Sequence, residues 1–272
     1  MMMEAVVDET GAQRLDVRVR RDGAESESLD WLADEVPVAL VFNGISHAVM
    51  LATPLDLEDF ALGFGLTEGL LARADELYGV ELRPDPAGMR VEMEVSSACF
   101  ARLKDRRRSM AGRTGCGLCG TESLEQVEPP LRPLAPCATS VSPPAIASAL
   151  RALPTRQALA QRTGATHAAA WCAPDGALRL VREDVGRHNA LDKLVGAMVE
   201  AGIDPRDGFC CITSRASVEM VRKAVAAGIT ALVAVSAPTA RAVATARQAG
   251  LALAGFARRD DLVLYASPER FR

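Results

Sequence analysis

The first clear hydrophobic pattern along the chain is a pair of apolar runs separated by a two-residue turn. Residues 36–42 and 45–51 are rich in Val, Leu and Ile, and Asn43-Gly44 lies between them. A two-residue hairpin turn needs positive φ at both positions, which Asn and Gly tolerate better than other residues. The sequence therefore predicts a β-hairpin here, and it predicts a polar, poorly ordered N-terminus over residues 1–27.

Helical and strand periodicities follow the hairpin. Four apolar residues recur at helical spacing after Asp56, and they predict a helix that Asp56 caps and that ends near Leu71. Apolar and polar residues then alternate in segments between residues 81 and 96, which predicts two strands. Residues 98–110 predict a basic helix. Together these elements indicate a small α+β domain over residues 28–128.

The second half of the chain has a different rhythm. Six prolines between residues 129 and 144 predict an extended connector. Strand-like and helix-like segments then alternate over residues 145–272, which indicates an α/β domain with helices on a largely parallel sheet. Asp175-Gly176 predicts a hairpin, so we expect the sheet to be mixed. The predicted strands are 168–172, 177–182, 209–213, 231–235, 251–256 and 262–265, and the predicted helices are 189–201, 218–227 and 239–249.

Composition narrows the class of protein. The chain has 272 residues, a formal net charge of −4 and a pI near 5.6, a balance that argues against general nucleic-acid binding. No apolar run approaches the roughly 18 residues of a membrane helix, and the N-terminus lacks the features of a signal peptide. We therefore expect a cytoplasmic protein that binds neither nucleic acid nor membranes.

Two cysteines carry the most specific chemistry in the sequence. Cys116 and Cys119 lie in Thr-Gly-Cys-Gly-Leu-Cys-Gly, where three glycines within six residues argue against helix or strand. Basic residues between Arg102 and Arg113 favour the thiolate form, although a solvated basic helix face explains them equally well. The pattern predicts a loop that presents two thiols.

The other five cysteines have no such setting. Cys210 and Cys211 lie in a predicted buried strand, whereas Cys99, Cys137 and Cys172 have no close partner, so we interpret all five as core residues. An odd number of cysteines without an export signal argues against a disulfide framework. A structural zinc site needs two more ligands at matching spacing, and no second Cys-x-x-Cys exists, so we assign no metal.

Three predicted turns between strands and helices are unusually polar. Residues 183–189 contain Glu, Asp, Arg, His and Asn, and residues 213–217 and 236–239 are rich in Ser and Thr. In open α/β sheets, ligands bind beyond the carboxyl ends of the strands, so these turns are candidates for holding an anion such as phosphate. For the second and third turns alone, helix capping is the better explanation. Arg187 and His188 in the first turn are the stronger candidates.

These motifs together resemble the formate dehydrogenase accessory sulfurtransferase family, FdhD. The resemblance rests on the cysteine motif at 114–120 and on Glu-Asp-Val-Gly-Arg-His-Asn-Ala-Leu-Asp-Lys at 183–193. Thr-Ser-Arg at 213–215, Ser-Ala-Pro-Thr at 236–239 and Gly-Phe-Ala-Arg at 255–258 extend it. The matches run in order from about Val36 to Phe271, so they cover nearly the whole chain.

The resemblance implies a sulfur-transfer function. Cys116 would carry a persulfide received from a cysteine desulfurase, and Cys119 would shuttle, protect or release the sulfur. The acceptor would be molybdenum cofactor with two guanine dinucleotides, Mo-bis(molybdopterin guanine dinucleotide), held as substrate before its insertion into formate dehydrogenase. The resemblance also implies a homodimer and, in the larger domain, a three-layer fold similar to that of cytidine deaminases.

The resemblance also implies where the cofactor binds. The corresponding segment is Phe256, Ala257, Arg258, Arg259, Asp260 and Asp261. The arginines suit phosphate and the aspartates can accept hydrogen bonds from guanine, whereas an ordinary surface turn is the plainer interpretation. Residues 259–261 depart from the small residues often found there. Arg187 and His188 are our next candidates for the same ligand.

Two other functions stay open at this point. A zinc-dependent nucleotide hydrolase or deaminase would use one histidine and two cysteines, although here the cysteine pair precedes the histidine and lacks the proline of the deaminase motif. A noncatalytic chaperone would hold the cofactor without using either thiol.

Overall fold

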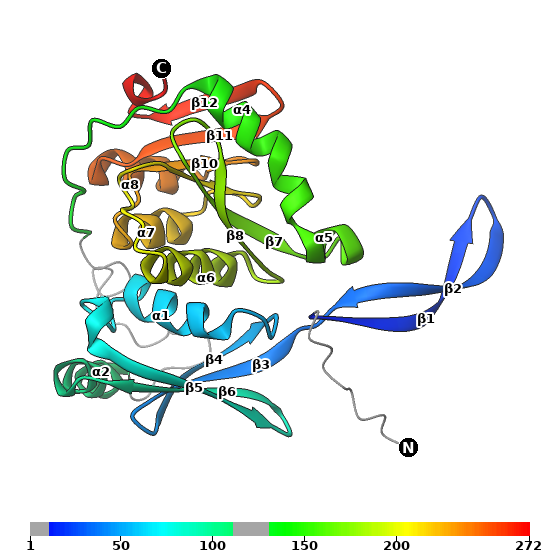
Figure 1. Cartoon of the computed structure of the whole chain (residues 1–272), viewed down its shortest axis with the longest axis horizontal. Helices are drawn as coiled ribbons and strands as arrows, with labels where there is room; N and C mark the ends of the chain where they lie inside the picture. The colour runs from blue at the N-terminus through cyan, green and yellow to red at the C-terminus, as the bar shows by residue number, and fades with distance from the viewer. Residues whose placement is uncertain (1–10, 111–130) are drawn as a thin grey trace.

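The structure is a computed structural model that describes residues 11–110 and 131–272. In these residues the chain is a mixed α/β protein with three β-sheets, as Figure 1 shows. One sheet is a two-stranded arm. A four-stranded sheet belongs to the small lobe, which we define as residues 36–110, and a six-stranded sheet belongs to the large lobe, residues 131–272.

The arm consists of β1 (Ala12–Arg21) and β2 (Ala24–Ala33), which pair antiparallel and project beyond the lobes (Figure 1). Near its base, Trp31 of β2 contacts Arg162 of the large lobe. Asp22 and Gly23 form its turn with φ of 51° and 83°. The prediction of a poorly ordered N-terminus is therefore wrong for residues 12–27. Residues 1–10 lie outside the described part of the chain.

The small lobe is built on the predicted hairpin. The sheet order is β4-β3-β6-β5, and Asn43 and Gly44 have φ of 44° and 78° as the turn requires. The apolar face of the sheet packs against α1, with Val91, Met93 and Val95 buried. The elements are β3 (Val36–Phe42), β4 (Ile45–Ala52), α1 (Leu57–Thr67), η1 (Ala74–Glu76), β5 (Leu77–Asp85), β6 (Gly88–Val95) and α2 (Ser97–Met110).

Helix α1 differs from its prediction at both ends. Asp56 precedes it with a φ of 51° and makes no side-chain capping bond. Its carboxylate faces Arg182 of the large lobe instead, at 3.6 Å. The helix ends at Thr67, because Leu70 and Leu71 turn back to donate backbone hydrogen bonds to the Gly65 carbonyl.

The large lobe contains the predicted mixed sheet, in the order β12-β11-β10-β9-β7-β8. Strands β9, β10 and β11 run parallel, whereas β7 is antiparallel to both of its neighbours. The strands are β7 (His167–Cys172), β8 (Leu178–Asp184), β9 (Phe209–Ile212), β10 (Ala231–Ala234), β11 (Ala252–Arg258) and β12 (Asp261–Ala266).

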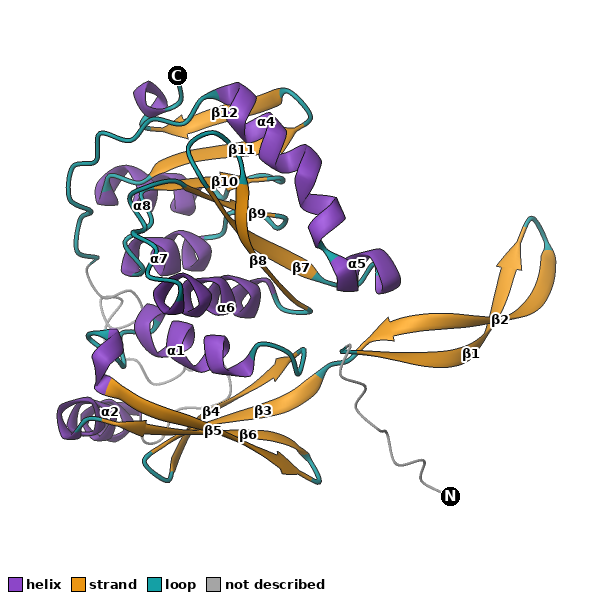
Figure 2. Ribbon diagram, viewed as in Figure 1, coloured by secondary structure: helices purple, strands orange, loops and turns teal. Residues whose placement is uncertain are grey.

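Helices cover both faces of this sheet (Figure 2). Helices α6 (Arg187–Glu200), α7 (Val218–Ala226) and α8 (Ala240–Ala249) pack on one face, and α4 (Pro143–Ala152) with η2 (Leu153–Arg156) packs on the other. Strands β9 and β10 are buried on both sides, which explains their continuous apolar sequences. The sequence did not predict α4, η2, α5 (Ala158–Thr163) or the terminal turn η3 (Pro268–Arg270). Pro143 and Pro144, which the sequence assigned to the extended connector, form the first turn of α4.

The connector and the lobe interface complete the fold. The described part of the connector, residues 131–142, has neither helix nor strand and hydrogen-bonds to the rest of the large lobe through Leu134 and Val141. The predicted domain boundaries stay predictions. The lobes meet where α1 packs on α6. Within the described residues, no helix has both the length and the apolar character needed to span a bilayer.

Candidate functional site

The polar turns of the sequence meet at one edge of the large sheet. Strands β9, β10 and β11 are parallel and end there, and β8 ends at the same edge because β7 is antiparallel to both β8 and β9. Residues 185–188, 213–217 and 235–239 therefore lie beyond strand ends at this edge, and residues 256–259 form the end of β11 and the turn that follows it. This is the position where ligands bind in open α/β sheets.

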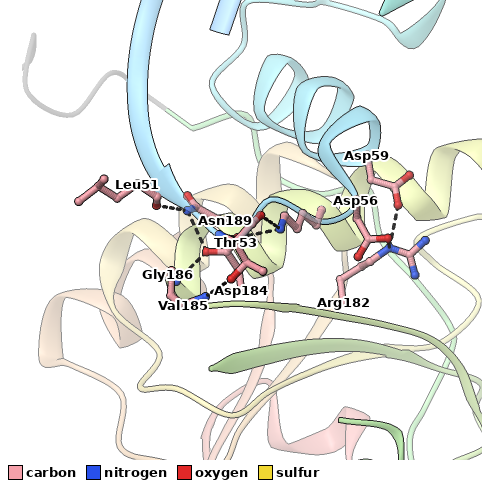
Figure 3. A network of polar contacts seen from close by, with 10 residues as sticks. Leu51, Thr53, Asp56, Asp59, Arg182, Asp184, Val185, Gly186 and Asn189 are labelled. Atoms are coloured by element: carbon pink, nitrogen blue, oxygen red, sulfur yellow. Dashed lines mark hydrogen bonds and ion pairs between the residues drawn. The ribbon is translucent and has the colours of Figure 1, made fainter. Parts of the chain in front are cut away.

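Most of the first turn is occupied by a buried network that joins the lobes (Figure 3). The Asp184 carboxylate accepts a hydrogen bond from the Thr53 amide at 3.0 Å and pairs with the Lys193 ammonium at 2.8 Å, with both charged side chains fully buried. Asn189 donates to the Leu51 carbonyl at 2.8 Å and to Asp184 at 3.0 Å. These three polar side chains of the 183–193 block therefore hold the structure together and are not available to a ligand.

The outer acid of the same turn is also occupied. The Glu183 carboxylate accepts hydrogen bonds from the Leu159 and Ala160 amides at 2.9 and 2.8 Å, so it caps the start of α5. It also accepts from the Thr166 hydroxyl at 2.9 Å. The density of polar residues in this turn thus has a largely structural cause.

Arg187 and His188 are the exceptions in this turn. In the described part of the chain, Arg187 Nε and His188 Nε2 are buried and lack hydrogen-bond partners. Burial, together with the positive charges of Arg187 and Lys223, lowers the pKa of His188 to about 4. At neutral pH this site therefore holds an uncharged imidazole beside a guanidinium, and both have free donors or acceptors.

A pocket of about 260 Å³ lies at the same edge, between the end of β11 and η2. Ala257, Arg258 and Arg259 line it, so half of the predicted cofactor segment surrounds one cavity. Arg258 also donates to the Val235 carbonyl at 3.3 Å, which fixes its guanidinium at the rim. The other lining residues are Leu150, Leu153, Pro154, Gln157, Thr213 and Val235.

The remaining residues of the predicted segment lie away from this pocket. Phe256 is 45% exposed with a φ of 50°, and Asp261 pairs with Arg258 in the ladder between β11 and β12. Asp260 forms an exposed ion pair with Arg151 at 2.9 Å. Neither aspartate lines the pocket, nor do Arg187 and His188, so the predicted residues fall into two separate groups.

The reactive thiols predicted from sequence, Cys116 and Cys119, lie outside the described residues. The five described cysteines are free thiols. Burial raises the pKa of Cys99 and of Cys210, so these thiols resist ionisation. Cys137 is partly exposed; burial opposes its ionisation, but hydrogen bonds from Thr139 outweigh that effect and lower its pKa. The described residues contain no group of three or more His, Cys, Asp or Glu side chains placed to hold a metal ion.

Sequence reasoning missed Gln157. This residue lies between two short elements, η2 and α5, and its surroundings show no periodic pattern. It is 8% exposed and lines the pocket beside Arg258 and Arg259. Nothing local in the sequence marks it, because its place in the pocket follows from the packing of η2 against the large sheet.

Comparison with known proteins identifies the family. A family model described as the FdhD/NarQ family matches residues 33–272. The chain belongs to the FdhD/NarQ family. One relative is "Sulfur carrier protein FdhD" of Variovorax paradoxus, which is 58% identical over 259 residues, or 95% of this chain and 93% of the relative. Another is "Sulfur carrier protein FdhD" of Cupriavidus necator, which is 58% identical over 93% of this chain and 87% of the relative.

A solved structure of a similar protein supports the fold. A protein from Desulfotalea psychrophila, described as a formate dehydrogenase accessory protein, matches 96% of this chain and 99% of its own with a TM-score of 0.76. Its sequence identity is 24%, so the likeness concerns the fold alone. The predicted family resemblance is confirmed. The family model begins at residue 33, so most of the arm lies outside it.

Proposed function

We propose that this protein is a sulfur carrier and sulfurtransferase. It would receive sulfur from a cysteine desulfurase on Cys116 and deliver it to Mo-bis(molybdopterin guanine dinucleotide) before that cofactor enters formate dehydrogenase. One observation carries the proposal. The Cys116-x-x-Cys119 pair, flanked by glycines, occurs in a chain that is 58% identical over 259 residues to a sulfur carrier protein.

The first chemical step is a thiol exchange. The Cys116 thiolate attacks the outer sulfur of the persulfide on the desulfurase, a new S–S bond forms on Cys116, and the desulfurase thiolate leaves. The step consumes no external oxidant or reductant, because one S–S bond replaces another. Basic residues before the motif favour the attacking thiolate.

The proposed binding of the cofactor that accepts the sulfur rests on residues at the edge of the large sheet. Arg258 and Arg259 at the pocket supply positive charge for the phosphates of a guanine dinucleotide, since guanidinium groups pair well with phosphate. Arg187 and His188 offer a second group of unpartnered atoms at the same edge. The likeness of the large lobe to cytidine deaminases and the homodimer belong to the same proposal.

Mass spectrometry of the intact protein and its peptides tests the sulfur step. The protein is incubated with an active cysteine desulfurase and cysteine, and we expect one added sulfur atom on the peptide containing Cys116 and Cys119 that reductant removes. The variant Cys116→Ala is expected to lose this gain. Cys137→Ala is the matched control, because Cys137 is a partly exposed thiol outside the motif, and it is expected to gain sulfur normally.

The same experiment separates the alternative functions. Absence of a sulfur gain with an active desulfurase contradicts the carrier and favours the chaperone. Stoichiometric, tightly held zinc found by elemental analysis favours the hydrolase or deaminase.

A further inference from the structure

The Gln157 side chain lines the pocket at the end of β11 without being used by the fold. The residue is 8% exposed and occupies the position before α5, yet its amide makes no capping hydrogen bond. Its amide is not among the buried polar groups of the described residues that lack a partner, so its free donors and acceptor face the pocket. A carboxamide that lines a pocket without a partner in the protein is available to a ligand.

Capping of α5 does not explain Gln157. The first free amides of that helix, on Leu159 and Ala160, already donate to the Glu183 carboxylate at 2.9 and 2.8 Å. The Gln157 backbone is fixed by its own hydrogen bond to the Pro154 carbonyl. The side chain is therefore held in place while its carboxamide keeps one acceptor oxygen and two donor hydrogens free.

The pocket around this amide suits a flat, partly polar ring. Its volume of about 260 Å³ lies below the range of about 300–1,000 Å³ that encloses drug-sized ligands, so it fits one base and not a whole dinucleotide. Leu150, Leu153 and Pro154 supply apolar surface, and Arg258 and Arg259 line the same pocket. The pocket therefore combines apolar surface for a base with positive charge for phosphate.

We infer that Gln157 binds the edge of the guanine base when the dinucleotide cofactor occupies this pocket. Its amide oxygen accepts from the base nitrogens and its amide nitrogen donates to the guanine carbonyl. The inference rests on the proposed function, which supplies the guanine. Because a rotated amide pairs equally well with adenine, Gln157 provides binding of a purine base and not discrimination between the two.

The assignment also changes the role of the predicted aspartates. Asp260 pairs with Arg151 and Asp261 lies in the strand ladder, and neither lines the pocket. We therefore assign the base contact to Gln157, which lines the pocket, and not to the β11–β12 turn.

The test is calorimetric titration of the full-length protein with GDP and, separately, with inorganic pyrophosphate. The measured quantity is the ratio of the two dissociation constants, because pyrophosphate lacks the base that Gln157 contacts. In Gln157→Leu we expect GDP binding to weaken about 10-fold or more, with pyrophosphate binding unchanged. The matched control is Gln248→Leu, an exposed glutamine on α8, and we expect it to match the wild type.

A second variant keeps the test decisive if Gln157→Leu fails to fold. Gln157→Asn keeps a neutral, polar amide but is one methylene shorter, so its amide no longer reaches the base, and GDP binding is expected to weaken with pyrophosphate binding unchanged. An unchanged ratio in the folded variants overturns this inference alone. If the wild-type protein binds neither GDP nor pyrophosphate, the proposed binding of the cofactor is contradicted. The proposed transfer of sulfur to Cys116 is tested separately, by mass spectrometry.

Discussion

The Asp184 carboxylate and the Lys193 ammonium form an ion pair of 2.8 Å in which both side chains have no exposed surface. Lys193 also donates to the Thr53 carbonyl at 2.9 Å, and Asp184 accepts from the Thr53 amide. One residue of the small lobe is thus held by both members of a pair in the large lobe. Asp184 also accepts a hydrogen bond from the Gly186 amide at 2.7 Å, so it fixes the turn that precedes Arg187 and His188.

Breaking this pair is expected to be costly. Asp184→Asn leaves the Lys193 charge buried without its partner, and we expect a loss of about 3–5 kcal/mol in the free energy of unfolding. Chemical denaturation measures it. Asp75→Asn, which removes the exposed pair with Arg73, is the matched control and should cost less than about 1 kcal/mol. Equal losses in the two variants contradict the structural role of Asp184.

The contact between α1 and α6 makes a second stability prediction. A Cβ atom on Gly63 would lie 1.7 Å from the Asp192 carbonyl oxygen, so the helix backbones would have to separate. We expect Gly63→Ala to destabilise the protein by about 1–3 kcal/mol or more, although alanine normally favours a helix over glycine.

The control for this variant is Gly79→Ala, because a Cβ atom there meets no heavy atom within 4 Å. Thermal unfolding of both variants measures the difference. A Gly63→Ala variant as stable as the wild type would mean that the lobes do not pack as closely as the structure shows.

Local patterns predicted the elements that bury one continuous face or carry a strong turn signal. Asn43-Gly44 gave the hairpin of the small lobe, and Asp22-Gly23 carries the same signal for the arm. The arm escaped prediction because most of its side chains are exposed on both faces, so its strands lack a clear apolar period. Helix α5 escaped because it has six residues and a single buried one.

The site could be predicted only in part for a related reason. Alternation of strands and helices placed the polar turns at one sheet edge, which is a property of strand direction alone. The sequence does not reveal which polar residues are consumed by the fold, because the partner of Asp184 at Thr53 is 131 positions away. Gln157 is the opposite case, since only the structure shows that it lines the pocket with an amide that caps no helix.

His188 makes a prediction about pH. Its pKa in the folded protein is about 4, below the usual value of 6.5, because of burial and the charges of Arg187 and Lys223. Its contribution to stability is therefore complete above pH 6.5 and is lost as the pH falls through 4. We expect the difference in unfolding free energy between wild type and His188→Gln to decrease over that range.

Proton NMR of the imidazole rings checks the same point directly, with His188→Gln used to assign the resonance. We expect a titration midpoint near 4, and a midpoint above 6 contradicts the burial of the ring. If Arg187 and His188 contact the phosphates of the ligand, pyrophosphate should raise the midpoint, because an anion favours the charged imidazole. A midpoint unchanged by saturating pyrophosphate removes these two residues from the site.

Loss of Cys116 should separate sulfur delivery from cofactor binding. In cells that lack their own copy of the protein, we expect Cys116→Ala to leave formate dehydrogenase activity at background, because no thiolate is available to carry the sulfur. The purified variant should still bind GDP as the wild type does, since the pocket at Arg258 lies on the large sheet. Cys137→Ala should retain full activation, because that thiol lies outside the motif.

The double variant Cys116→Ala/Cys119→Ala distinguishes the carrier from the chaperone, which needs neither thiol. Full activation by the double variant contradicts the carrier. The single variant Cys119→Ala then defines the role of the second thiol. If it accumulates persulfide on Cys116 but does not activate the client, Cys119 acts in release of the sulfur. If it fails to accumulate persulfide, Cys119 acts in its uptake or protection.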